Sequence, residues 1–284
     1  MVDFNEARKG KPPAVVEEPK VPALADDEFE GVAGAGLETR GADELVTPFL
    51  YVLQSNSKPC QVGASEYVEG AKAGMFFNNA TKRIYKEVEY VPVDRDYRFV
   101  EWTPIAPERG LNGGFVAVHE PDSELVVRLR QEQGKFKALK TDHDTEIVET
   151  FEIYAIIGEP GFTIEDSEQV IIPFTSIKIS RYKLWYDAAR KIRYQTANGL
   201  VQPAIYQHRW RLRSVFESKW KPNGAMNVTI SLAGDKPIDA FIRKTDPIFI
   251  TAKAFYEARV AGTATVKADY SKAAQEVSEE EIPF

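Results

Sequence analysis

Two strand-like runs follow each other in the stretch Glu87-Val-Glu-Tyr-Val-Pro-Val-Asp-Arg-Asp-Tyr-Arg-Phe-Val-Glu-Trp102, and the predicted fold depends on them most. Both runs, 87–93 and 97–102, are rich in β-branched and aromatic residues, which favour strands. Between them Asp94 and Asp96 flank Arg95 and are expected to form paired surface charges. Similar runs recur at 46–54, 74–77, 114–118, 125–129, 151–157 and 170–174. Polar turns at 78–79, 112–114 and 159–161 separate them, which indicates an antiparallel, mostly β domain.

Two segments predict helices. Residues 176–193 place Ile177, Ser180, Leu184, Ala188 and Ile192 near one face, and 249–274 reads as a C-terminal helix with Gly262 as a candidate break. Between these helices, 204–216 alternates as a strand and 226–232 can pair back with it. The expected fold class is therefore mostly β with a few helices (α+β).

Composition and segment boundaries divide the chain into three parts. The predicted parts are a disordered leader at 1–45 with four prolines, a β-rich domain at 46–275, and an acidic tail at 276–284. The single cysteine, Cys60, indicates a reducing cytosol, and no stretch resembles a signal core or a membrane span. A soluble protein of the cytoplasm is expected, in the host cytoplasm if the chain is phage-encoded.

Charge is distributed unevenly along the chain. The formal net charge is -7, yet residues 175–221 contain eleven basic residues and only Asp187 and Glu217 as acids. The basic residues are Lys178, Arg181, Lys183, Arg190, Lys191, Arg193, Arg209, Arg211, Arg213, Lys219 and Lys221. Because a solvated face normally mixes both signs, this imbalance predicts a surface that meets a polyanion.

The basic segment is also aromatic, which is typical of proteins that bind single-stranded nucleic acid through phosphates and base faces. For any one ring, burial in the core is the favoured alternative. Tyr182, Trp185 and Tyr194 are the rings most expected to stack on bases. The predicted nucleic-acid-binding residues are Lys178, Arg181, Tyr182, Lys183, Trp185, Arg190, Lys191, Arg193, Tyr194, Arg209, Trp210, Arg211 and Arg213. Arg128 and Arg130, on a predicted strand, are expected to extend the same nucleic-acid-binding surface.

Catalytic patterns are weak. The chain has three histidines, and Thr141-Asp-His-Asp-Thr-Glu146 is read as a hairpin turn in preference to a metal cluster. Cys60 has no histidine near it in the sequence. We expect no enzymatic activity, no cofactor and no metal. A metal-dependent nuclease using Asp142, His143, Asp144 and Glu146 remains a rival reading.

The chain ends in Glu279, Glu280, Glu281, Ile282, Pro283 and Phe284. Such an acidic segment with an apolar end suits a docking peptide, whose terminal ring fills a partner's pocket. The tail resembles that of bacterial and phage single-stranded DNA-binding proteins. A looser resemblance to the phage members of that family runs through 48–57, 74–81, 97–102 and 176–181. It implies an OB-like barrel or a related antiparallel barrel.

The resemblance also implies coating of single strands and recruitment of replication or recombination proteins through the tail. The expected function is therefore sequence-independent binding and protection of single-stranded DNA. A homo-oligomer is a candidate form of the protein, although the sequence does not fix the oligomeric state. The alternative is a non-enzymatic phage structural or assembly protein in which the tail is only a docking peptide. No membrane partner is expected.

Overall fold

The computed structural model describes residues 47–106, 111–134, 138–219 and 224–261. Contacts group the chain into two units, Met1–Arg40 and Gly41–Phe284, and all described residues belong to the second. The predicted leader at 1–45 and tail at 276–284 lie outside the described residues.

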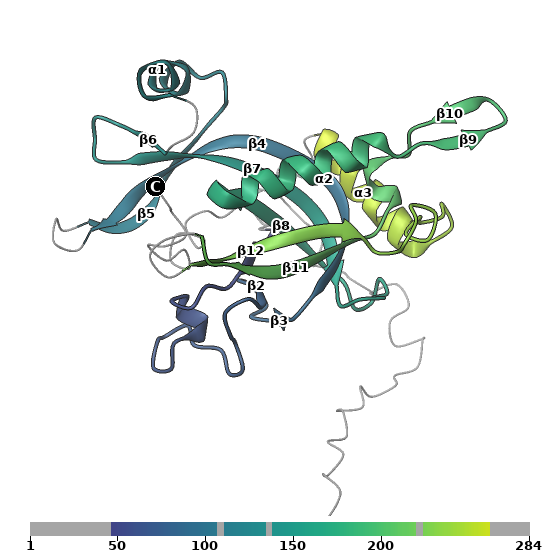
Figure 1. Ribbon diagram of the computed structural model, residues 1–284, viewed down its shortest axis with the longest axis horizontal. Coiled ribbons are helices and arrows are strands. Elements are labelled where there is room, and N and C mark those ends of the chain that lie inside the picture. Colours follow the sequence, from purple (N-terminus) through teal and green to yellow (C-terminus); the bar gives the residue numbers. More distant parts are fainter. Residues whose placement is uncertain (1–46, 107–110, 135–137, 220–223, 262–284) are drawn as a thin grey trace, which may run out of the picture. The chain divides into compact units, whose positions relative to one another are not determined.

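Among the described residues, antiparallel strands hold more of the chain than the helices do (Figure 1). The main sheet has the order β12-β11-β4-β7-β6, with β5 also paired to β4 and β8 to β7. Its strands are β4 (Val88–Ala106), β5 (Leu111–His119), β6 (Leu139–Lys140), β7 (Glu146–Gly158), β8 (Glu168–Thr175), β11 (Trp210–Glu217) and β12 (Ala225–Leu232). The smaller sheets contain β1 (Leu50–Val52), β2 (Phe76–Asn78) and β3 (Ile84–Tyr85), and β9 (Tyr194–Thr196) and β10 (Gly199–Val201). The expected antiparallel α+β class is confirmed.

The two runs that predicted the fold are one strand. Strand β4 continues through 88–106, and its register against β7 shifts between Pro92 and Asp94. A bulge of this kind absorbs the irregularity that proline and the charged residues introduce, so the strand bends without ending. The long β4–β7 ladder is the centre of the sheet.

An OB-like barrel is not confirmed. Along the main path of described strands the sheet starts at β12 and ends at β6, and no pairing between these two strands closes it within the described residues. The turn predicted at 159–161 does join β7 to β8, and Gly161 adopts the positive φ of 84° that glycine tolerates best.

Helices cover both faces of the sheet in the described part of the chain (Figure 1). They are α1 (Glu124–Gln133), α2 (Ile179–Lys191) and α3 (Pro247–Val260), with the 3-10 turns η3 (Lys58–Cys60), η5 (Ser176–Lys178) and η6 (Ile205–Gln207). Side chains alternate along β7, so Ile153 packs in the core under α2 while Tyr154 packs in the core under α3. None of the described helices combines the length and apolar character needed to cross a membrane.

Three local predictions are wrong. The run 125–129 forms α1, because Val126 and Leu129 are buried at helical spacing while Val127 between them is exposed. Helix α2 forms as predicted, but Leu184 on its predicted apolar face is 63% exposed. Residues 205–207 form η6, so the strand predicted at 204–216 begins only at Trp210.

Candidate nucleic-acid interface

Three of the rings predicted to touch nucleic acid lie in the core. Tyr182 and Trp185 are each 2% exposed and Trp210 is 4% exposed. Trp185 packs edge-on to Trp210 at 6.0 Å between ring centroids, and Tyr182 stacks on Phe151. These rings fill the space between α2 and the sheet, so they do not form an exposed surface on which the bases of a strand could stack. The alternative of core burial therefore holds for all three.

The arginine row of β11, defined as Arg211 and Arg213 of the strand with Arg209 directly before it, is paired with carboxylates. Arg209 Nη1 lies 3.0 Å from Glu89 Oε1, and Arg211 and Arg213 lie 2.8 and 2.7 Å from the two carboxylate oxygens of Glu87. Both glutamates come from the β4 side of the β11–β4 ladder, in which Arg211 is the partner of Glu89. The inference that this row lacks acids is wrong, because the acids come from a distant part of the sequence.

Arg181 and Lys178 are also not free cations at the surface. Arg181 Nη2 lies 2.5 Å from Glu217 Oε1, and Lys178 is 8% exposed. Tyr194 is half-buried, and its hydroxyl lies 2.8 Å from His208 Nε2. Burial lowers the pKa of His208 to about 4, so the imidazole is neutral at physiological pH.

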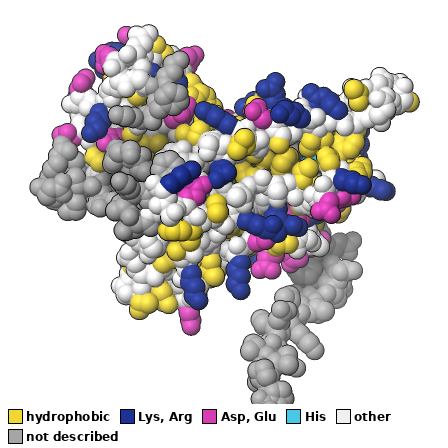
Figure 2. Space-filling model, in the orientation of Figure 1, with side chains coloured by type: hydrophobic (Ala, Val, Ile, Leu, Met, Phe, Trp, Pro, Cys, Tyr) yellow, Lys and Arg dark blue, Asp and Glu magenta, His cyan; other side chains and the backbone are white. Residues whose placement is uncertain are grey.

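Four of the predicted cations remain exposed on or just after α2. Lys183, Arg190, Lys191 and Arg193 form no ion pair with a carboxylate of the described residues. Asp187, on the same helix, is also exposed and forms no ion pair with a described residue. Figure 2 shows basic side chains gathered over α2, beside an apolar band. This surface carries uncompensated positive charge, in contrast to the β11 row.

A tyrosine on α2 lies between two arginines from different elements. Arg95 is on β4, and its Cζ lies 4.3 Å from the centroid of the Tyr186 ring. Arg190 is on α2, and its Cζ lies 5.4 Å from the same centroid. The aspartates next to Arg95 are engaged by other arginines: Arg259 contacts Asp94 at 2.8 Å, and Asp96 pairs with Arg98. The expectation of paired charges is thus confirmed for the aspartates, whereas Arg95 stacks on a ring.

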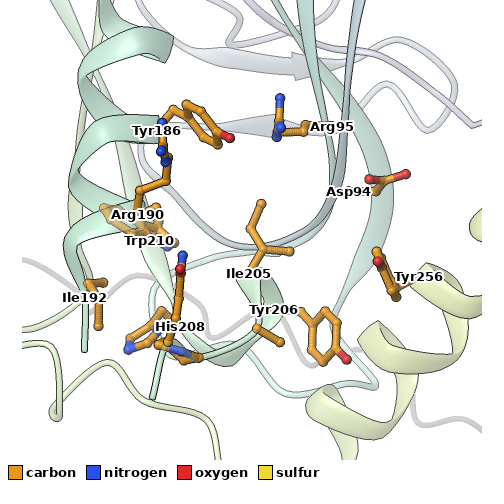
Figure 3. A pocket seen from close by; sticks show the side chains of 14 residues that line it. Asp94, Arg95, Tyr186, Arg190, Ile192, Ile205, Tyr206, His208, Trp210 and Tyr256 are labelled. Carbon is orange, nitrogen blue, oxygen red and sulfur yellow. The ribbon is translucent and has the colours of Figure 1, made fainter. Parts of the chain in front are cut away.

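Tyr186 and these two arginines open into a cavity of about 660 Å³ (Figure 3). Its wall combines residues of β4, α2, η6 and α3, which lie far apart in the sequence. The lining residues are Asp94, Arg95, Tyr186, Ala189, Arg190, Ile192, Gln202, Pro203, Ala204, Ile205, Tyr206, His208, Trp210 and Tyr256. In Figure 3 the Tyr186 hydroxyl and the Arg95 side chain lie at one end of the space, and Tyr206 lies at the other.

The remaining predicted residues lie elsewhere or outside the described residues. Arg128 and Arg130 are on α1, not on a strand; Arg128 pairs with Asp142 at 3.6 Å, and Arg130 donates to the Tyr97 hydroxyl at 3.2 Å.

The turn at 141–146 is confirmed, since Thr141 N donates to Thr145 O and β6 pairs with β7. No group of three or more potential metal ligands occurs within the described residues. The tail residues lie outside them.

Sequence reasoning missed Arg95, Tyr206 and Tyr256 as members of one site. Arg95 was read as a surface charge, and Tyr256 belongs to a helix that gave no site signal. In the sequence Arg95 stands between two aspartates, so no local pattern marked it as a cation without a carboxylate partner. No sequence signal joined η6 to α3, because their contact depends on the tertiary fold.

The chain belongs to the family of Pam3 phage gp34-like proteins, whose family model matches residues 15–265. No curated protein and no solved structure gives a significant match.

Proposed function

We propose that this member of the Pam3 phage gp34-like family binds single-stranded DNA without sequence preference, through the exposed cations of α2 and the rings beside them. The observation that carries the proposal is the basic surface of α2, in which Lys183, Arg190 and Lys191 have no carboxylate partner among the described residues. Uncompensated cations attract a polyanion over the Debye length and release its counterions on contact.

The neighbouring ring favours a single strand over a duplex. Tyr186 is only partly buried and lies within reach of two guanidinium groups, so positive charge and an aromatic ring lie together in one place. A duplex presents phosphates but hides its base faces, whereas a single strand presents both. Arginine beside an aromatic ring is a common element of such binding surfaces.

The test is a fluorescence anisotropy titration of the full chain with labelled oligo-dT and with a duplex of equal length, at several salt concentrations. We expect tighter binding to the single strand and a steep loss of affinity with salt. The variant Arg190→Ala/Lys191→Ala should reduce the log–log salt slope by about 1.4, since each lost phosphate contact on a single strand contributes about 0.7.

The matched control is Lys72→Ala/Lys86→Ala, which removes the same charge from two exposed lysines near β2 and β3. This control should retain the salt slope of the unmodified chain. Absence of binding at low salt, or equal slopes for the two double variants, would refute the proposal.

A second candidate function, a structural or assembly role, is favoured by the β9–β10 hairpin. Its residues Leu200 and Val201 are 71% and 47% exposed, and Figure 1 shows the hairpin projecting beyond α2. Exposed apolar side chains on a projecting hairpin suit a protein partner or a second copy. Light scattering of the unmodified chain and of the double variant Leu200→Ser/Val201→Ser tests this role. The role requires that the unmodified chain forms an assembly and that the double variant does not.

A further inference from the structure

The cavity beside α2 exists because the sheet is interrupted there. Strand β11 pairs with β4 only from Trp210 to Leu212, opposite Val88–Tyr90. Beyond Trp210 the chain runs back into η6, and β4 bends at its bulge. Asp94 and Arg95 therefore border the cavity at a position where a neighbouring strand of the sheet is missing from the ladder.

Rings and aliphatic side chains line one part of this cavity. Tyr206 of η6 lies 5.7 Å from Tyr256 of α3 between ring centroids, at an interplanar angle of 45°. Ile192 and Ile205 add apolar surface. Figure 3 shows Tyr206 and Tyr256 on the same side of the space. Flat rings in a partly enclosed apolar space fit a planar heterocycle.

The other part of the cavity is cationic. Arg95 and Arg190 both line it, and neither pairs with a carboxylate of the described residues. Asp94 is the acid among the described lining residues, and Arg259 holds it at 2.8 Å. Because Asp94 is already engaged, the charge of the two guanidinium groups remains available to an anion. Arginine binds phosphate oxygens through its fork of donors.

We propose that this cavity binds one unstacked nucleotide, with its phosphate at Arg95 and Arg190 and its base against Tyr206 and Tyr256. The inference rests on the proposed function, because the nucleotide belongs to the bound strand. It adds a specific place where the strand leaves the surface of α2. A volume of about 660 Å³ accommodates a single nucleotide and lies within the range of small-molecule sites.

The first experiment titrates the full chain with thymidine monophosphate, with thymidine, and with deoxyribose 5-phosphate, followed by calorimetry. We expect the monophosphate to bind about tenfold or more tightly than either fragment, because only it uses both the charged and the ring-lined part. Arg95→Ala should reduce monophosphate binding to the level of thymidine.

Arg83→Ala is the matched control, since Arg83 also lies over a tyrosine ring, Tyr85 at 5.2 Å, but is paired with Glu168 at 3.2 Å. It should bind the monophosphate as the unmodified chain does. Equal loss in Arg83→Ala and Arg95→Ala would overturn the assignment of the phosphate to Arg95.

The second experiment separates a nucleotide in a strand from a free nucleotide. Ala189→Phe places a ring into the cavity from α2, and Ile205→Phe does so from η6. Each variant that keeps the thermal unfolding curve of the unmodified chain should lose about fivefold or more of its affinity for oligo-dT. The affinity for an abasic deoxyribose-phosphate oligomer should stay unchanged.

The outcomes distinguish the two proposals. If oligo-dT binds but the monophosphate does not, and both filled variants bind oligo-dT normally, the cavity inference fails and the proposed function stands. If no oligonucleotide binds at all, the proposed function fails. If the monophosphate binds while oligo-dT does not, the cavity is a site for a free nucleotide, and the strand-bound form of the inference is overturned.

Discussion

The arginine row of β11 and the cations of α2 look alike in the sequence and differ in the structure. Arg209, Arg211 and Arg213 pair with Glu89, which lies on the neighbouring strand β4, and with Glu87, which directly precedes that strand. Lys183, Arg190 and Lys191 on α2 have no such partner among the described residues. Charge counted along the chain therefore does not measure charge at a surface, since pairing across a sheet joins residues far apart in sequence. The paired arginines beside β4 contribute to the stability of the fold, whereas the unpaired cations of α2 are available to a ligand.

The largest effect is expected where the two regions share a core. Trp185→Ala removes a ring that packs between α2 and Trp210, and large-to-small changes of this kind cost about 3–5 kcal/mol. Urea unfolding should show this loss in the free energy of unfolding. Trp185→Phe, which keeps an aromatic ring, should lose clearly less. A Trp185→Ala protein of normal stability with impaired DNA binding would instead restore Trp185 as a surface ring.

The next largest effect concerns the ion pairs of β11. Glu89→Gln leaves Arg209 without its carboxylate in a site where the Glu89 side chain is 6% exposed, so we expect a loss of about 2–4 kcal/mol. Glu87→Gln is the matched control at a more exposed pair, at 26%, and should cost about 1 kcal/mol or less. Equal losses in urea unfolding would contradict the distinction between a buried and an exposed pair.

A smaller effect is expected from pH. Burial lowers the pKa of His208 to about 4 from an ordinary value near 6.5, so between these values the unfolded chain binds more protons than the folded one. Stability should therefore fall as the pH is lowered, by on the order of 2 kcal/mol between pH 6.5 and pH 5. His208→Gln keeps an acceptor for the Tyr194 hydroxyl and should reduce this dependence. A parallel pH profile for both proteins would show that other groups cause it.

The smallest effect on stability is expected at the α2 surface. Lys191→Ala removes an exposed cation without a carboxylate partner in the described residues, so the free energy of unfolding should change by about 0.5 kcal/mol or less. The variant should nevertheless bind oligo-dT more weakly than the unmodified chain does. This difference in affinity should be smaller at high salt. A stability loss as large as that of Glu89→Gln would remove the contrast between the two regions.

The antiparallel β character and helix α2 could be predicted from local composition and spacing. The run 125–129 could not, because its β-branched residues suit a strand, whereas the burial of Val126 and Leu129 requires a helix. The sequence identifies the cation-rich segment, but Tyr182, Trp185 and Trp210, which are predicted to touch nucleic acid, lie in the core. Helical periodicity favours Leu184 for the core, yet the space under α2 is filled by Tyr182 and Trp185.

The sequence by itself determined the antiparallel β class, the helix at α2 and the concentration of cations and rings in 175–221, because these depend on residue type and short-range spacing. Only the tertiary structure decided which cations are neutralised and where a cavity opens. Glu87 reaches Arg213, and Tyr256 meets Tyr206, only after the sheet and α3 have assembled. Such contacts are set by packing of distant segments, which no local pattern encodes.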